Sequence, residues 1–176
     1  MSPEFLGLSH VEFITIDAMG PPGERTFYLQ AQQGDMLVTL LIEKEHAAAL
    51  SIGIQQMLEN LGGLLEDEDI PTDMALRQPI HPLFQVGSMG LGYDPDEDAL
   101  VIIARAPAIE EMSEDSVPEV HFWCSRARSF ALAEYAAIVV ASGRPRCPVC
   151  NEPLDKDELH VCTRGNGRKK LFEVGE

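Results

Sequence analysis

The stretch VTLLIEKEHAAAL, residues 38–50, passes from the pattern of a buried strand to that of a helix within a few residues. A similar pattern, VHFWCSRARSFAL, occupies residues 120–132, at a constant offset of 82. The pattern therefore predicts three strands followed by a helix in each half of the chain. Two such units can bury their apolar sheet faces in one core, with a helix covering part of each. Identities between the halves are few, so both a duplication and a chance similarity of pattern account for the match.

This organisation predicts an α+β fold with a mainly antiparallel sheet built from two strand-strand-strand-helix halves. Alternation of β-branched and apolar residues predicts strands, and apolar residues at helical spacing predict two helices. The strands are expected at residues 11–17, 25–33, 36–43, 83–91, 100–104 and 117–124, and the helices at 46–61 and 126–141. We expect an acidic body over residues 1–143, with halves at 10–63 and 83–143, and a zinc-binding module with a basic tail over 144–176.

The charge is distributed unevenly along the chain. Residues 1–124 contain four basic and 22 acidic side chains, whereas residues 125–172 contain nine basic and five acidic ones. The acidic body should repel nucleic acid and anionic membranes. No apolar run approaches the roughly 18–20 residues of a membrane span, and no signal peptide is expected at the N-terminus. The four cysteines do not form a disulfide framework, which favours a cytoplasmic protein.

A metal-binding pattern lies near the C-terminus. Cys147 and Cys150 form a Cys-x-x-Cys turn, and His160 and Cys162 follow after nine intervening residues. Alternate residues of an extended strand point to the same side, so His160 and Cys162 can face one centre. Four such ligands are the usual complement of a closed structural zinc site. The alternatives are a redox dithiol, which would normally begin a helix after a strand, and a catalytic zinc, which would keep an open position.

Three stretches together resemble a known family. They are RTFYLQAQQG (residues 25–34), FQVGSMGLGYD (84–94), and GRPRCPVCNEPLD with HVCTRGNG (143–155 and 160–167). The combination resembles the uncharacterised bacterial DUF3090 family, which is common in actinobacteria. The resemblance implies no activity. Members of that family are often encoded beside histidine-phosphatase-like and phosphoinositide-kinase-like proteins, which implies an accessory role in a shared pathway.

Other candidate residues have structural as well as functional interpretations. Gly87 and Gly90 lack the lysine and serine of a phosphate-binding loop, so a bulged or closely approached strand is expected. His121 and Trp123 alternate on one strand and share a face, opposite Phe122 and Cys124. That face is either a site or a half-exposed sheet surface.

The main expectation is a zinc-stabilised accessory or adaptor protein, without catalysis, that binds a protein or an anionic ligand. One alternative is a hydrolase or transferase for a phosphorylated substrate, using Arg25, His121 and the basic tail. The other is nucleic-acid binding through the zinc module. Its basic tail contains Arg164, Arg168, Lys169 and Lys170.

Overall fold

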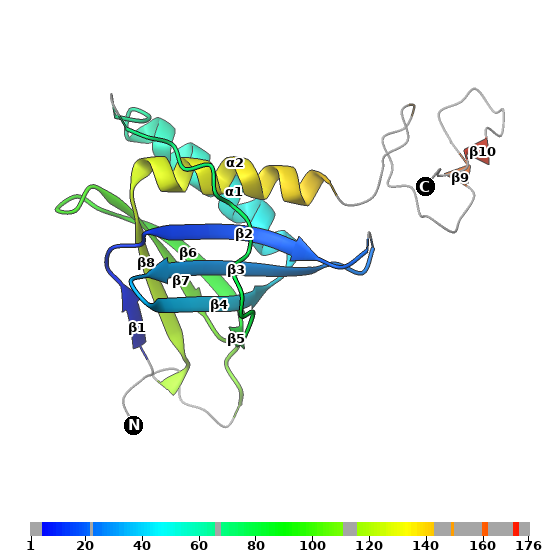
Figure 1. Cartoon of the computed structure of the whole chain (residues 1–176), viewed down its shortest axis with the longest axis horizontal. Coiled ribbons are helices and arrows are strands. Elements are labelled where there is room, and N and C mark those ends of the chain that lie inside the picture. Colours follow the sequence, from blue (N-terminus) through cyan, green and yellow to red (C-terminus); the bar gives the residue numbers. More distant parts are fainter. Residues whose placement is uncertain are drawn as a thin grey trace.

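The computed structural model describes residues 5–21, 23–65, 68–110, 116–142, 149, 160–161 and 171–172. Within these ranges the chain forms two four-stranded sheets, two helices and a two-stranded ladder (Figure 1). The α+β class and the two helices agree with the sequence-based prediction. Each four-stranded sheet is mixed, because three antiparallel strands are joined by one parallel strand.

The first half contains an antiparallel meander of β2 (Phe13–Met19), β3 (Thr26–Gln33) and β4 (Met36–Ile42), followed by α1 (Lys44–Asn60). Gly34 makes the tight turn between β3 and β4 with a φ of 58°. The helix begins two residues before the predicted start, where the backbone N–H of Glu43 donates to His46 Nδ1 at 3.1 Å. It ends before Gly62 and Gly63, whose φ values of 91° and 87° suit glycine.

The second half repeats this order with β6 (Ser88–Asp94), β7 (Ala99–Arg105), β8 (Glu119–Cys124) and α2 (Arg126–Ala141). The helix has the predicted bounds. Ser125 caps it, because its side-chain oxygen accepts a hydrogen bond from the backbone N–H of Arg128 at 3.2 Å.

Two short strands connect the halves in a way the sequence did not indicate. β1 (Phe5–Leu8) pairs in parallel with β8, and β5 (Pro82–Gln85) pairs in parallel with β4, so each joins the sheet of the other half. The single strand expected at residues 83–91 was wrong. The chain changes sheets at Val86 and Gly87: the first donates its N–H to Leu41 O and the second to Arg105 O, both at 2.8 Å.

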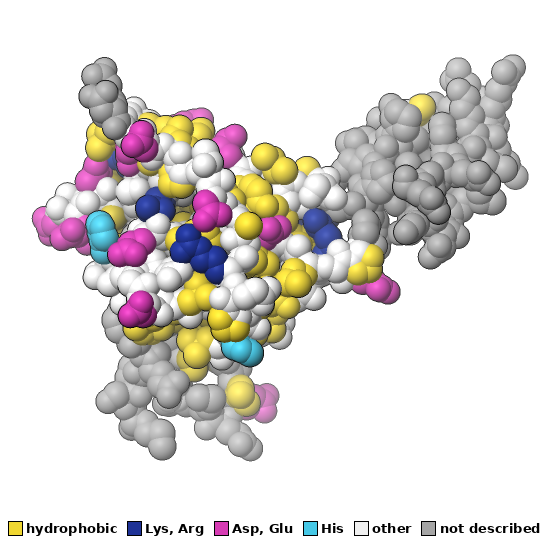
Figure 2. Space-filling model, viewed as in Figure 1, with side chains coloured by type: hydrophobic (Ala, Val, Ile, Leu, Met, Phe, Trp, Pro, Cys, Tyr) yellow, Lys and Arg dark blue, Asp and Glu magenta, His cyan; other side chains and the backbone are white. Residues whose placement is uncertain are grey.

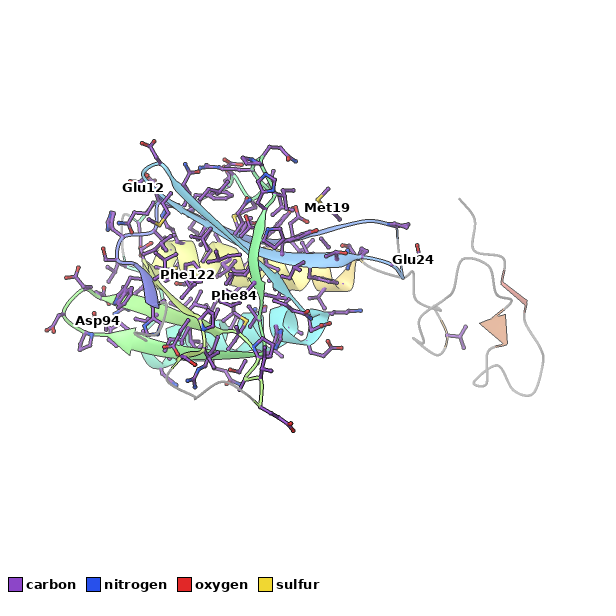
Figure 3. The ribbon with its side chains drawn as sticks, turned by 90° about the horizontal axis from the view of Figure 1, so that it is seen from below. Glu12, Met19, Glu24, Phe84, Asp94 and Phe122 are labelled. Atoms are coloured by element: carbon purple, nitrogen blue, oxygen red, sulfur yellow. The ribbon has the colours of Figure 1, made fainter. Side chains whose placement is uncertain are left out.

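One apolar core unites both sheets and both helices. Fully buried side chains include Ile16 and Leu29 from the first sheet, Ile102 and Phe122 from the second, and Leu132 from α2. Phe122 lies in the interior in Figure 3. The two helices pack against each other, and α2 also contacts β2 while α1 contacts β6. Because each helix contacts the other half's sheet, the described parts of the two halves pack around one shared core.

Corresponding contacts recur in the two halves. Val11 donates its N–H to Trp123 O at 3.2 Å, in the same way that Val86 donates to Leu41 O. Where the helices meet, Ser51 Oγ donates to the carbonyl oxygen of Ala133 at 2.7 Å, 82 residues away. The internal repetition is thus a property of the fold, while duplication as its origin stays a prediction.

The described part of the C-terminal region is one short antiparallel ladder, β9 (His160–Val161) with β10 (Leu171–Phe172). The rest of the predicted zinc module, apart from residue 149, lies outside the described residues, so the zinc-ribbon prediction and the boundary at residue 143 stay predictions. Neither described helix is long and apolar enough to cross a membrane.

Candidate functional site

The outer surface of the second sheet contains the predicted histidine–tryptophan pair. Cross-strand pairing places Gly90, Ile103 and His121 side by side in one row. Gly92, Val101 and Trp123 form a second row. We call the set Gly90, Gly92, Ile103, His121 and Trp123 the His–Trp face. The opposite side of β8 faces the core, since Phe122 and Cys124 are fully buried. The predicted alternation along this strand is therefore confirmed.

Polar contacts orient both rings of the His–Trp face. The indole N–H of Trp123 donates to Asp94 Oδ2 at 3.1 Å, so the indole spans the sheet from β8 to the end of β6. His121 Nε2 contacts the carboxylate of Glu119, which also pairs with Arg105 Nε at 3.5 Å. The two ring centroids lie 5.8 Å apart at an interplanar angle of 43°. The face is thus a half-buried aromatic surface bordered by carboxylates.

Two glycines of β6, Gly90 and Gly92, are not required by close packing against any described residue. A Cβ on Gly90 would approach Ile103 Cβ at 3.8 Å, an ordinary contact, and a Cβ on Gly92 would meet no described atom within 4 Å. Neither has a positive φ. Gly87 is different, because its Cβ would lie 2.7 Å from Pro107 Cα. The expectation of a closely approached strand is met at Gly87. It is not met at Gly90, where the missing side chain instead leaves a lower sheet surface.

A small open pocket lies where α1 meets the edge strand β6. Its volume is about 140 Å³. The lining residues are His46, Ala49, Leu50 and Gly53 from α1, and Met89, Gly90 and Leu91 from β6. Gly53 sits in the middle of the helix, and a Cβ there would only touch Leu91 Cδ2 at 3.5 Å. The imidazole of His46 is the one titratable group in this lining, so the pocket suits an apolar group of side-chain size.

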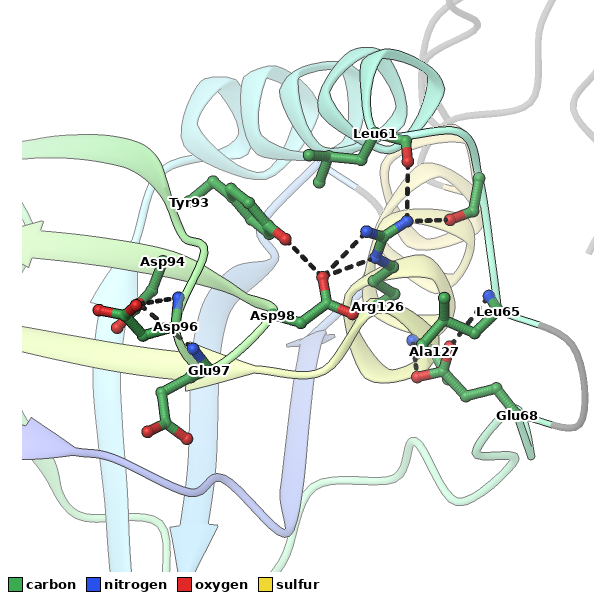
Figure 4. Close-up of polar contacts among 11 residues, drawn as sticks. Leu61, Leu65, Glu68, Tyr93, Asp94, Asp96, Glu97, Asp98, Arg126 and Ala127 are labelled. Atoms are coloured by element: carbon green, nitrogen blue, oxygen red, sulfur yellow. Dashed lines mark hydrogen bonds and ion pairs between the residues drawn. The ribbon is translucent and has the colours of Figure 1, made fainter.

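Arg126 forms a polar cluster at the opposite end of α1 (Figure 4). Its Nη1 donates to the carbonyl oxygens of Leu61 and Gly63 at 2.9 and 3.0 Å, and its guanidinium pairs with Asp98 at 2.9 Å. The hydroxyl of Tyr93 also donates to Asp98, at 2.6 Å. Helix ends leave carbonyls without intrahelical partners. Because α1 has no basic residue in its last turn, Arg126 supplies the missing donors.

The ionisation of this cluster follows from its contacts. The hydrogen bond from Tyr93, followed by that from Arg126, lowers the pKa of Asp98 below its ordinary value. The same bond raises the pKa of Tyr93, and the bond to Asp98 raises the pKa of Arg126. Each group is thus held in the charge state it has at neutral pH. The cluster serves a structural role, because its donors are directed to backbone carbonyls and to one another.

Arg25 performs the same task for α2. Its Nη2 donates to the carbonyl oxygen of Val139 at 2.6 Å, and its guanidinium lies 4.9 Å from the ring centre of Phe27. The hydrolase hypothesis expects Arg25 to act together with His121. The structure instead places Arg25 at the C-terminus of α2 and His121 on β8, and neither lines the pocket beside α1.

The predicted metal ligands fall outside the part of the chain that can be described. This holds for Cys147, Cys150 and Cys162, while the backbone of His160 forms part of β9. The basic residues Arg164, Arg168, Lys169 and Lys170 also lie outside it. Among the described residues, no three His, Cys, Asp or Glu side chains lie close enough to hold a metal ion.

Sequence reasoning missed the residues that fasten separate elements together. Gln30 is fully buried, yet a glutamine within a strand normally indicates a solvent-facing position. Its amide instead bonds both the N–H and the carbonyl oxygen of Arg77. Arg126 follows the Ser125 cap and reads as an ordinary helix-surface arginine. No sequence pattern reports such contacts, because the partners are 47 and more than 60 residues away.

A comparison with known protein families identifies one to which most of the chain corresponds. Residues 7–162 match the family model described as "Protein of unknown function (DUF3090)". The chain belongs to this family. No curated protein and no solved structure matches the chain. The family resemblance inferred from three stretches of sequence is therefore confirmed, and the family carries no activity to transfer.

Proposed function

We propose that this DUF3090 chain is a zinc-stabilised accessory or adaptor protein of the cytoplasm, which binds another protein and catalyses no reaction itself. The observation that carries the proposal is the pocket between α1 and β6. It is lined almost entirely by small and apolar residues and opens beside an edge strand. An extended segment of a partner can pair along such an edge and place one apolar side chain in an adjacent pocket.

The charge distribution favours a protein partner over an anionic ligand. His46 is the sole group in the pocket lining that can become cationic. The body as a whole is acidic, with six basic and 23 acidic side chains in residues 1–142, and on the face displayed in Figure 2 Lys and Arg side chains are fewer than Asp and Glu. Such a surface repels phosphate and nucleic acid. It attracts a partner segment whose flanks are basic.

Zinc has a structural role in this proposal. Cys147, Cys150, His160 and Cys162 would hold the ion in a closed tetrahedral site, which stabilises a module too small for its own apolar core. The purified protein should carry about one zinc per chain, measured by elemental analysis, and Cys150→Ser should abolish binding. Full zinc retention in that variant would contradict this ligand set.

The partner proposal is tested by photo-cross-linking in cells that produce the full chain. A photoreactive phenylalanine at Ala49, which lines the pocket, should capture one specific protein. Capture should fail when Gly53→Met fills the pocket in the same chain, and a photoreactive residue at exposed Glu134 on α2 should not capture that protein. Capture that persists in the filled variant would contradict pocket binding.

The hydrolase or transferase hypothesis and the nucleic-acid hypothesis each predict a result that the adaptor proposal does not. Turnover of a phosphorylated substrate that is lost in both His121→Gln and Arg25→Met would show catalysis. Micromolar binding of DNA or RNA at physiological salt, lost when Arg164, Arg168, Lys169 and Lys170 are replaced by serine, would show a nucleic-acid module. We expect neither result, because the acidic body offsets the few phosphate contacts that four basic residues supply.

A further inference from the structure

The two helices correspond residue by residue at an offset of 82. Their N-terminal caps, Glu43 and Ser125, stand at this offset. The hydrogen bond at the crossing of the helices joins two residues that are also 82 apart. Gly53 in the middle of α1 therefore corresponds to Tyr135 in the middle of α2. The smallest residue of one helix thus stands where the other helix carries a large aromatic side chain.

The edge strands that these helices contact, β2 and β6, correspond as well. Leu40 of β4 and Phe122 of β8 stand at the same offset of 82. Pairing across the first sheet leads from Leu40 to Ile16 of β2, and pairing across the second leads from Phe122 to Leu91 of β6. Ile16 is fully buried, whereas Leu91 is only half-buried. The second edge strand is therefore less completely covered than the first.

The difference between the two edges coincides with the tyrosine. Tyr135 packs against the core and spans from α2 to β2, where its hydroxyl donates to Oδ2 of Asp17 at 3.0 Å. Asp17 is the neighbour of Ile16. In the other half Gly53 extends no side chain toward β6, and a Cβ there would meet Leu91 Cδ2 at 3.5 Å. Gly53 and Leu91 both line the pocket. The pocket is thus the place at which the first half has a tyrosine ring.

The size and polarity of the pocket suit such a ring. Its volume is about 140 Å³, and an apolar protein cavity of roughly 150 Å³ is known to bind benzene. His46 is the one titratable residue in the described lining, and its Nδ1 already accepts a hydrogen bond from the backbone N–H of Glu43. The remaining lining is small or apolar, so a six-membered ring matches the pocket in both volume and chemistry.

The surroundings of the pocket indicate where the ring comes from. Among the described residues no strand pairs with the outer edge of β6. A segment paired there would direct every second side chain toward the side of the sheet on which α1 lies. Carboxylates follow the lining in both directions, because Glu45 precedes His46 on α1 and Asp94 ends β6. Basic residues on both sides of the inserted ring therefore complement the site.

We propose that the pocket binds the aromatic ring of a phenylalanine or tyrosine from an extended partner segment that pairs with β6 and has basic flanks. The ring takes the place beside Gly53 that Tyr135 fills in the other half. This inference rests on the proposed function, since it names the group that the partner inserts. The partner completes the second half of the fold in the way that α2 completes the first with its own side chain.

Peptide binding to the full-length protein tests the preference for a ring. The probes are blocked Lys-Thr-Phe-Thr-Lys peptides in which the central residue is phenylalanine, tyrosine, leucine or alanine. NMR titration should show that both aromatic peptides bind several-fold more tightly than the leucine peptide, with amide shifts at Gly53 and Leu91. Gly53→Met should abolish these shifts. Equal binding of the leucine peptide, or no binding of either aromatic peptide, would overturn the inference.

A variant that supplies the ring from within gives a second test. Gly53→Tyr should melt at a higher temperature than Gly53→Ala and should no longer bind the phenylalanine peptide. Alanine has the higher helix propensity, so only burial of the ring can place the tyrosine variant above the alanine variant. Ile52→Tyr, on the exposed surface of α1, should keep native peptide binding. A Gly53→Tyr variant that melts below Gly53→Ala would overturn the inference.

The proposed function and the ring preference fail in different ways. If the leucine peptide binds as tightly as the aromatic ones while cross-linking at Ala49 still captures a protein that Gly53→Met displaces, only the ring preference is wrong. If the aromatic peptides are preferred but no protein is captured at Ala49, the proposed protein partner is wrong.

Discussion

Gly53→Ala should stabilise the protein while it narrows the candidate pocket. Glycine in a helix interior costs about 0.8–1.0 kcal/mol relative to alanine. The added Cβ would lie 3.5 Å from Leu91 Cδ2, an ordinary van der Waals distance that requires no rearrangement. The free energy of unfolding should therefore rise by about 1 kcal/mol, which raises the melting temperature by about 2–4 °C in a protein of this size. A fold selected only for stability would carry alanine here.

Gly87→Ala provides the matched control. Its Cβ would lie 2.7 Å from Pro107 Cα and 2.8 Å from Pro107 N, so backbone must move. We expect a loss of about 1–3 kcal/mol, the usual cost of overpacking. Urea unfolding followed by circular dichroism measures both variants. If Gly53→Ala is destabilised as much as Gly87→Ala, then the helix needs glycine for packing and the argument for an externally occupied pocket fails.

The remaining predictions concern buried polar groups. Ser51→Ala should lower the free energy of unfolding by about 1 kcal/mol, because a buried hydrogen bond to Ala133 is lost. Ser129→Ala should be neutral or stabilising in the same urea titration, since its fully buried hydroxyl has no partner among the described residues; a clear loss would reveal one. Burial raises the pKa of Cys124 to about 12, so iodoacetamide mapping at pH 8 should leave this thiol unmodified until urea unfolds the chain. Because the pKa of Asp98 is lowered, its stabilising contribution is present above the ordinary pKa near 3.8 and is lost as pH falls further. Asp98→Asn should therefore reduce the loss of stability that occurs as the pH falls below 3.8, and an acid unfolding profile identical to that of the native chain would contradict this contribution of Asp98.

Local patterns determined the type of most elements. The 3.6-residue spacing of apolar side chains predicted α2 with its observed bounds, and alternation along β8 predicted which side chains face the core. These features depend on residues within one or two turns of each other. The spacing of the predicted zinc ligands is local in the same sense, which is why sequence alone supports that prediction.

Long-range contacts decided which strands share a sheet. β1 has four residues, one of them glycine, and its parallel partner β8 begins more than 100 residues later. β5 and β6 are separated at Val86 and Gly87. The backbone N–H groups of these two residues donate to strands of different sheets. Strand-like composition continues through this point, so no local signal marks the change.

The candidate site shows the same division between local pattern and tertiary structure. The sequence by itself determined that His121 and Trp123 lie together on one surface of a strand, because successive side chains alternate in direction. Only the tertiary structure decided that α1 forms a pocket with β6, and that Tyr135 lies at the corresponding place in the other half. The physical reason is that pockets arise between elements far apart in the chain. Their energies depend on burial and hydrogen bonding across the fold, which the periodicity of one segment does not record.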